Sequence, residues 1–80
     1  MIVEVRLFAV LRKYLPAGSE RTRTLMELPA GISIADVLAR LSIPAEQATL
    51  VLVNGRHEAN RLRRLEQDCV LSVFPPIAGG

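Results

Sequence analysis

The most distinctive chemical group in this 80-residue chain is its C-terminal carboxylate, which belongs to Gly80 and follows Gly79. Neither glycine has a side chain, so nothing shields the terminal carbonyl from attack or fills a narrow channel that the chain end would enter. A carboxylate becomes an acyl donor only after activation, typically by nucleotide transfer from ATP. The sequence has no glycine-rich phosphate loop, so a separate activating enzyme would have to use the ATP.

The five residues before these glycines are apolar and stiff, and they read Phe74, Pro75, Pro76, Ile77 and Ala78. Disordered chain ends are usually polar, whereas consecutive prolines favour an extended backbone. Six extended residues span roughly 20 Å at about 3.3 Å each. We therefore expect residues 75–80 to form a flexible tail that enters the active site of another protein. The alternative is a frayed chain end without a partner.

The remaining candidate groups offer less chemistry. His57 has no Cys or His at metal-ligand spacing, so we expect an exposed polar residue or a partner contact. Cys69 is the single cysteine, which excludes an internal disulfide, and its apolar neighbours favour a small buried side chain over a nucleophile. Asp36 follows Ser33 at the spacing of a capping box, which favours a helix cap over a catalytic acid. The sequence thus predicts no bound cofactor and no metal site.

Composition argues against nucleic acid or a membrane as the partner. The net charge is only +2 and aromatic residues make up 4% of the chain, whereas 50% of the residues are hydrophobic. No apolar run is long enough to span a bilayer, and we expect a cytoplasmic protein without a signal peptide. The one basic cluster consists of Arg61, Arg63 and Arg64, with Arg56 nearby. It is interpreted first as a solvated turn, second as a docking surface for an acidic partner, and last as a nucleic-acid patch.

The N-terminal half predicts two strands and the main helix. Residues 2–8 alternate between apolar and polar, residues 9–15 suit a short helix, and residues 21–28 alternate again. A tight antiparallel pairing of these two strands is plausible. The clearest helix has Ser33 as its N-cap, and its apolar stripe consists of Ile34, Val37, Leu38 and Leu41.

The C-terminal half predicts two more strands. Residues 48–53 form an apolar, β-branched run, and an Asn-Gly pair then signals a tight turn. The following segment is polar and irregular, and we expect Leu62 and Leu65 to fill the lower core. Residues 70–74 are apolar on both faces, so this strand should be central or face a partner. Together with the main helix, the predicted strands make one α+β domain over residues 1–80.

The tail and the order of elements resemble the MoaD/ThiS family of ubiquitin-like sulfur carriers. Residues 74–80 closely resemble the ending of the MoaD branch. Residues 7–12, 34–38 and 53–55 are similar, in order, to its Phe-Ala-x-x-Arg passage, its helix opening and its third-strand end. The resemblance implies a β-grasp fold with a mixed four- to five-stranded sheet. Residues 66–68 depart from the frequent Asp-Gly-Asp because they lack the glycine, which leaves the geometry of that turn open.

The resemblance also implies a carrier cycle. An enzyme of the MoeB/ThiF type would adenylate Gly80, and a sulfur donor would convert it to a thiocarboxylate. The sulfur would then pass to a precursor of the molybdenum cofactor in a large subunit similar to MoaE. The residues implied to thread and anchor the tail are Phe74, Pro75, Pro76, Ile77 and Ala78, with Gly79 keeping the channel clear. His57 and its neighbour Arg56 are weaker candidates for the same partners.

Other functions remain open at this stage. ThiS-type carriers share the Gly-Gly end and supply sulfur for the thiamine thiazole, and related carriers serve other sulfur-containing products. A ubiquitin-like modifier would instead join Gly80 to lysine side chains of target proteins. A β-grasp interaction module with an idle tail is the third alternative.

Overall fold

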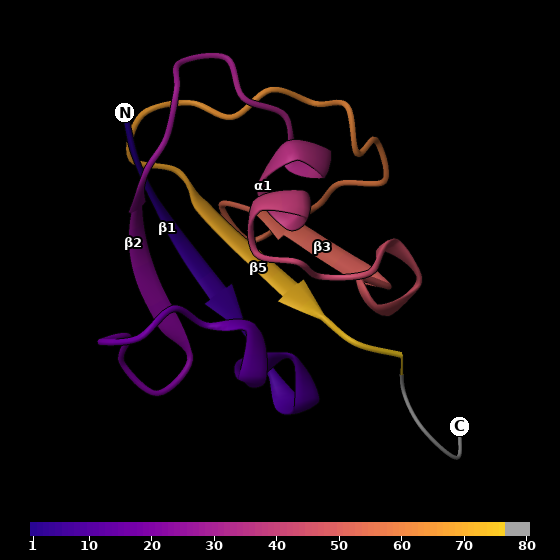
Figure 1. Ribbon diagram of the computed structural model, residues 1–80. Coiled ribbons are helices and arrows are strands. Elements are labelled where there is room, and N and C mark those ends of the chain that lie inside the picture. Colours follow the sequence, from indigo (N-terminus) through magenta and orange to yellow (C-terminus); the bar gives the residue numbers. More distant parts are fainter. Residues whose placement is uncertain (77–80) are drawn as a thin grey trace.

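The computed structural model, which describes residues 1–76, contains a five-stranded mixed sheet with one α-helix on one face (Figure 1). The strands are β1 (Ile2–Leu7), β2 (Arg23–Glu27), β3 (Leu50–Val53), β4 (Arg56–His57) and β5 (Val70–Phe74). The α-helix is α1 (Ile34–Arg40), and two 3-10 helices are η1 (Ala9–Tyr14) and η2 (Ala45–Gln47). This arrangement confirms the predicted α+β class.

The sheet has the order β2-β1-β5-β3-β4, so the last strand of the chain is its central strand. β5 lies parallel to β1 and antiparallel to β3, which confirms the prediction that this strand is central. β1 and β2 form the expected antiparallel pair. The sequence pattern missed the two-residue strand β4, which joins β3 through a turn where Asn54 and Gly55 have φ angles of 51° and 81°.

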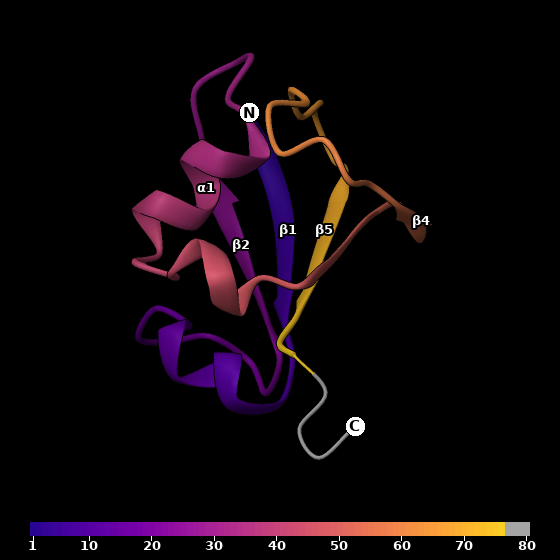
Figure 2. The same cartoon turned by 90° about the vertical axis from the view of Figure 1, so that its right-hand side faces the viewer.

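The core lies between α1 and the face of the sheet beneath it, as Figure 2 shows. Ser33 and Asp36 form the predicted capping box: Ser33 Oγ accepts the Asp36 N–H at 3.1 Å, and Asp36 Oδ2 accepts the Ser33 N–H at 3.4 Å. The apolar stripe of the helix is buried as expected. It packs over inward-facing side chains of the three inner strands, which are Val3, Val5, Leu7, Val51, Val53, Leu71 and Val73.

One of the two leucines expected in the lower core is not there. Leu65 is buried and its N–H donates to the Ile32 carbonyl at 2.8 Å, but the Leu62 side chain is 74% exposed. The chain turns at Asn60, whose Oδ1 accepts the Leu62 N–H at 3.0 Å. This turn directs Arg61 toward the body of the protein instead, where its guanidinium donates to backbone carbonyls.

The turn before β5 forms without the glycine common in the family. Asp68 adopts a left-handed φ of 65°, which costs an ordinary residue about 1–2 kcal/mol. The N-terminal strand compensates with backbone bonds, since the Asp68 N–H donates to the Ile2 carbonyl at 2.8 Å. Gln67, which occupies the glycine position, accepts the Ile2 N–H on Oε1 at 2.9 Å. The departure from the family pattern therefore tethers the turn to β1.

Candidate docking groove at the base of the tail

β5 holds the start of the tail in a fixed place. The Phe74 carbonyl accepts the Thr49 N–H at 3.0 Å, and the preceding Val73 carbonyl accepts the Phe8 N–H at 3.2 Å. The backbone is thus bonded on both sides up to the residue before Pro75. Proline has no N–H, so the ladder cannot continue in the same way into the tail. The sheet therefore supplies a rigid base at the point where the tail begins.

Two phenylalanines stack at this base. The Phe8 and Phe74 rings lie with their centroids 4.3 Å apart and their planes within 3° of each other. They meet because β1 and β5 are parallel neighbours, so their C-terminal ends lie side by side. Both side chains remain partly exposed. Such aromatic pairs contribute about 0.5–1.5 kcal/mol beyond the area that they bury.

An apolar groove, here called the tail groove, surrounds this stack. Val10 and Leu50 are 64% and 38% exposed, so the groove keeps large aliphatic side chains in contact with solvent. Among residues 1–76, Lys13 is its only charged lining residue. Exposed apolar side chains gathered in one place mark binding surfaces, because folding gains little from them. The described residues that line it are Phe8, Ala9, Val10, Lys13, Gln47, Leu50, Phe74, Pro75 and Pro76.

The exposure of Val10 follows from how the chain leaves β1. Ala9, the first residue of η1, has a left-handed φ of 53°, so the chain turns sharply where η1 begins. Leu11 anchors η1 by its fully buried side chain, and its N–H donates to the Phe8 carbonyl at 3.0 Å. Val10, the residue before this anchor, is left in the groove. A non-glycine residue at positive φ is strained by about 1 kcal/mol or more, and such strain concentrates at functional sites.

The structure places three of the predicted tail residues in this groove: Phe74, Pro75 and Pro76. The other four lie outside the described residues; they are Ile77, Ala78, Gly79 and Gly80. His57 lies on β4, exposed and paired with Leu52, and it does not line the groove. Its role in partner binding stays a prediction.

Sequence reasoning missed six groove residues, and the large apolar ones among them are Phe8, Val10 and Leu50. Phe8 and Val10 lie at the end of β1 and the start of η1, whereas Leu50 begins β3. Only the parallel pairing of β1 with β5 and the antiparallel pairing of β5 with β3 bring these two segments together. One weak signal was available: in the predicted short helix Val10 lies on the same face as Lys13, away from Leu11 and Leu15. An apolar side chain on a polar face points to a partner only where it joins a larger exposed apolar patch, and the sequence does not show that patch.

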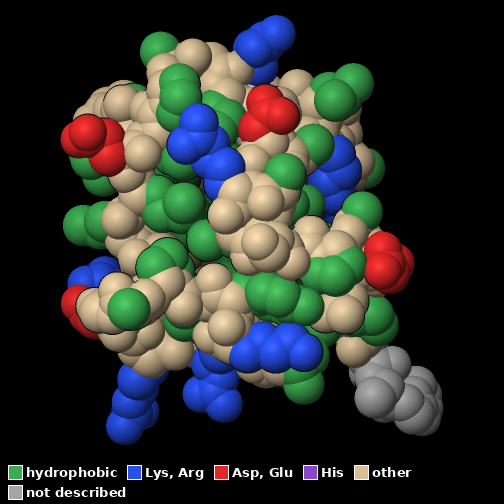
Figure 3. Space-filling model, viewed as in Figure 1, with side chains coloured by type: hydrophobic (Ala, Val, Ile, Leu, Met, Phe, Trp, Pro, Cys, Tyr) green, Lys and Arg blue, Asp and Glu red, His purple; other side chains and the backbone are tan. Residues whose placement is uncertain are grey.

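The arginine cluster fastens a loop to the rest of the domain. Arg61 Nη2 donates to the Ala48 carbonyl at 2.8 Å, and Arg64 Nη1 donates to the Gly31 carbonyl at 2.6 Å. Arg63 pairs with acidic side chains on both sides of it in sequence. On the side that Figure 3 shows, Lys and Arg side chains are spread among other residue types and form no continuous patch. These contacts support a structural role for the cluster.

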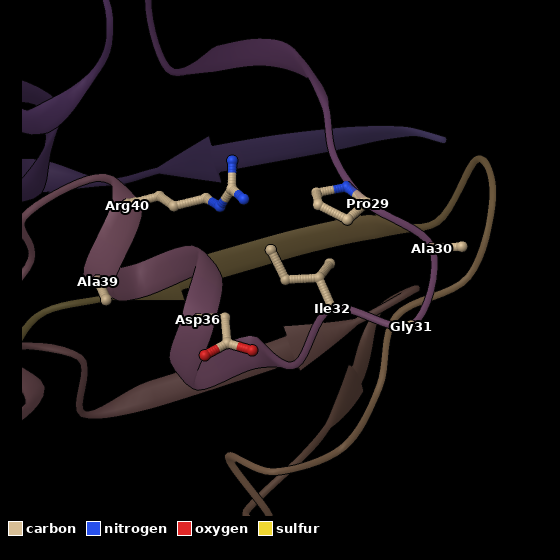
Figure 4. A pocket seen from close by; sticks show the side chains of 7 residues that line it. All are labelled: Pro29, Ala30, Gly31, Ile32, Asp36, Ala39 and Arg40. Atoms are coloured by element: carbon tan, nitrogen blue, oxygen red, sulfur yellow. The ribbon is translucent and has the colours of Figure 1, made fainter.

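A second hollow lies beside α1 and carries no chemistry beyond helix capping. Figure 4 shows the Asp36 carboxylate near the start of the helix and the Arg40 side chain extending toward Pro29. Within residues 1–76, Asp36 and Arg40 form no ion pair, and Asp36 instead accepts the Ser33 N–H. No three Cys, His, Asp or Glu side chains in this part of the chain lie where they could share a metal ion. Cys69 is buried, as predicted.

Comparison of the sequence with protein-family models shows to which family this α+β domain belongs. The sequence matches the ThiS family model over residues 5–80, which is nearly the whole chain and includes both terminal glycines. The chain belongs to the ThiS family. The resemblance to the MoaD/ThiS sulfur carriers, first recognised from residues 74–80, is thereby confirmed. No curated protein sequence matches this ThiS family member.

Solved structures show the fold of this ThiS family member. The HVO 2177 protein of Haloferax volcanii is 26% identical over 100% of this chain and 87% of its own, with a TM-score of 0.78. Small archaeal modifier protein 1 of H. volcanii is 24% identical over 95% and 98%, with a TM-score of 0.70. A chain from the complex of subunits 1 and 2 of molybdopterin-converting factor of Helicobacter pylori is 20% identical over 100% of both chains, with a TM-score of 0.61. These likenesses confirm the β-grasp fold.

No helix within the described residues is both long and apolar enough to cross a membrane.

Proposed function

We propose that this protein is a sulfur carrier that supplies the sulfur of the molybdenum cofactor, as the small subunit of a molybdopterin synthase. In this proposal Gly80 is the reacting residue, and residues 75–79 carry it into the active sites of partner enzymes. The tail groove is the surface on which those enzymes hold the carrier. The protein itself binds no cofactor and uses ATP only through its activating enzyme.

The observation that carries the proposal is that the tail groove lies at the end of β5, where the C-terminal segment matched by the family model begins. The match extends to Gly80, and the tail that ends there starts from β5, the central strand of the sheet, which pairs with β1 on one side and with β3 on the other. The groove lies where this strand ends, and it presents Val10 and Leu50 to solvent. A partner that covers the groove therefore also receives the tail.

The reaction needs two steps on the terminal carboxylate. First, a carboxylate oxygen of Gly80 attacks the α-phosphate of ATP, which gives an acyl-adenylate and releases pyrophosphate. Second, a donor that delivers sulfur at the oxidation level of sulfide attacks the acyl carbon and displaces AMP. The product is a thiocarboxylate, in which sulfur has replaced one carboxylate oxygen. Both steps take place on partner enzymes, and the missing side chains of Gly79 and Gly80 keep the carbonyl accessible.

The groove also suggests the kind of surface that the partner offers. Its walls are aromatic, aliphatic and proline side chains around one lysine. Aromatic residues at the centre of an interface commonly dominate its binding energy, so the Phe8–Phe74 stack is the expected anchor. The structural likeness to a chain of the H. pylori subunit 1 and 2 complex supports a large subunit of the MoaE type as one such partner.

Intact-mass spectrometry tests the proposal. The protein is incubated with an activating enzyme of the MoeB/ThiF type, ATP and a sulfur donor, alongside a variant that lacks Gly80. We expect the wild type alone to gain the mass difference between one sulfur and one oxygen, and to lose it again with a MoaE-type subunit and a pterin precursor. No gain, with activation verified on a known carrier, would contradict the carrier function.

A carrier for the thiamine thiazole or for another product is the first alternative, because the family match itself is to ThiS. Both carriers would form the same thiocarboxylate, so the acceptor has to be tested separately. The loaded protein is offered in parallel to a MoaE-type subunit and to a thiazole synthase, each with its substrate. Sulfur loss only with the synthase would assign the thiazole role.

A protein modifier is the second alternative, which the likeness to small archaeal modifier protein 1 favours. Amide formation between Gly80 and target lysines would give adducts of higher mass on a blot against a tagged copy. The chain offers a sharp control because Lys13 is its only lysine. Any side-chain linkage between two copies would have to use Lys13, and Lys13→Arg would abolish it while conjugates with other proteins persist.

A further inference from the structure

β2 is a free edge of the sheet. It stands at one end of the strand order, with β1 on its inner side and no strand on its outer side among residues 1–76 (Figure 1). The Leu28 N–H donates to the Met1 carbonyl and the Thr22 carbonyl accepts the Leu7 N–H, both at 2.7 Å. Since bonded residues alternate along an antiparallel ladder, the even-numbered residues of β2 bond to β1. The odd-numbered residues turn their N–H and C=O groups outward.

The outward residues also share one face of the sheet. The register pairs Arg23, Leu25 and Glu27 with Arg6, Glu4 and Ile2, whose side chains lie on the face that α1 does not cover. Leu25 is 66% exposed, although it is a large apolar side chain on a strand. The edge thus presents a basic, an apolar and an acidic side chain at equal spacing, together with backbone groups that point away from β1.

We propose that a second copy of this protein pairs with this edge, antiparallel and centred on Leu25. In that register Leu25 faces Leu25 of the second copy, and Arg23 faces Glu27 of the second copy at both ends. The backbone groups of the three outward residues also point toward the new pair, and of these the Arg23 carbonyl already accepts the Glu20 N–H. A single two-fold axis therefore allows backbone hydrogen bonds, the contact between the two Leu25 side chains and both Arg23–Glu27 pairs to form together.

The charges select this arrangement over its competitors. Charged side chains on an edge strand usually prevent pairing with other chains. Parallel pairing in register would place Arg23 beside Arg23 and Glu27 beside Glu27, so it is disfavoured. The antiparallel register instead places opposite charges in cross-strand positions, where they are favourable. Glu27 suits this contact because it forms no ion pair within the described residues.

Arg23 has to share its guanidinium in the paired state. Arg23 Nε already lies 3.2 Å from Glu20 Oε2, and Arg23 Nη1 lies 3.5 Å from Glu4 Oε1. The Arg23 backbone carbonyl also accepts the Glu20 N–H at 3.0 Å. A carbonyl has two lone pairs and a guanidinium has five N–H donors, so these contacts do not exclude a further partner. A single five-residue strand also buries far less than the roughly 1,600 Å² of a standard interface. We therefore expect weak association, with a dissociation constant of about 0.1–1 mM.

Two charge variants test the register. A copy with Arg23→Glu presents two acidic side chains, and a copy with Glu27→Arg presents two basic ones, so each repels its own kind. When the two are mixed, opposite charges face each other at both ends. Sedimentation equilibrium at about 1 mM protein should show self-association about tenfold weaker than wild type for each variant, and near wild-type association for the mixture. A role confined to the folding of one copy would not produce this rescue.

Apolar variants separate the edge from other surfaces. Leu25→Arg should abolish self-association, whereas Leu62→Arg, at a comparably exposed leucine on a distant loop, should leave it unchanged. Val10→Arg should also leave it unchanged, because Val10 lies in the tail groove. A monomeric wild type at about 1 mM, no rescue in the charge mixture, or loss of association with Val10→Arg instead of Leu25→Arg would each overturn the proposal.

Discussion

The core and the tail groove are both built from apolar residues, but the core buries their side chains and the groove leaves them exposed to solvent. Between α1 and the sheet, aliphatic side chains such as Leu71 and Val73 are fully buried. In the groove, Val10 and Leu50 remain exposed, and the Phe8–Phe74 stack is only partly covered. Neighbours in sequence can belong to different regions, since Val73 points into the core and Phe74 lines the groove.

The contrast between the core and the tail groove shows that apolar character alone does not reveal what a residue does. Burial converts an apolar side chain into folding free energy at roughly 25 cal/mol per Å² removed from water. Groove residues remove little area from water in the isolated protein, so their apolar character is better explained by a partner that covers them. Substitutions in the two regions should therefore separate stability from partner binding.

The largest effect is expected in the core. Leu71→Ala removes a fully buried side chain from the central strand, and it should lower the free energy of unfolding by about 2–4 kcal/mol. Chemical denaturation monitored by circular dichroism measures this loss. A loss below about 1 kcal/mol would mean that the region can collapse around the deletion and is not the close-packed core described above.

Phe74→Ala should have a smaller effect on folding and a large effect on partner binding. It removes a partly exposed ring and its stacking contact, which together are expected to stabilise the fold by about 1–2 kcal/mol. A double-mutant cycle with Phe8→Ala isolates the stack, and the expected coupling is about 0.5–1.5 kcal/mol. No coupling would show that the two rings do not act together.

Ser33→Ala separates stability from partner binding because it acts on the helix that covers the core, far from the groove in sequence. It removes the Oγ that accepts the Asp36 N–H, and loss of such a cap costs about 1 kcal/mol. Stability should fall while thiocarboxylate formation on the folded protein stays at the wild-type rate. A matching loss of sulfur loading would mean that stability alone explains the effect of groove variants.

The smallest effect is expected from a surface contact that belongs to neither region. The hydrogen bond that Arg23 donates to Glu20 is the main cause that lowers the pKa of Glu20, and the positive charge of Arg23 is the second. The same two contacts raise the pKa of Arg23. A lowered carboxyl pKa stabilises the fold above the unfolded-state pKa, and this contribution is lost as the pH falls through the folded-state pKa. We expect a slight extra loss of stability in acid that Arg23→Gln removes, since both groups are exposed. Thermal unfolding as a function of pH measures it.

Local patterns were enough to predict the core. Alternation in residues 2–8 and 21–28, the cap at Ser33 and the apolar stripe of α1 each reflect a rule that acts within a few residues. The two errors in the predicted fold concern Leu62 and β4, which no local pattern could place. Leu62 was placed in the core because the turn at Asn60 is not visible as a pattern, and β4 was missed because two residues carry no period.

The groove was predictable only in part. Phe74 and the prolines stand out because an apolar, proline-rich ending is unusual for a chain end. Phe8 and Leu50 carry no such signal, because their proximity depends on β5 pairing with both β1 and β3. Topology of this kind joins residues more than forty positions apart, and no spacing rule reports it.

The most direct test compares sulfur loading in two matched variants, Val10→Arg and Leu62→Arg. Both add an arginine at a highly exposed apolar position, so both should change the free energy of unfolding by no more than about 0.5 kcal/mol. Intact-mass spectrometry then follows thiocarboxylate formation on each with the activating enzyme, ATP and a sulfur donor. We predict that Val10→Arg loads at least about tenfold more slowly than wild type, the equivalent of about 1.4 kcal/mol, and that Leu62→Arg loads normally. Equal loading of the two variants would contradict the assignment of the tail groove as the docking surface.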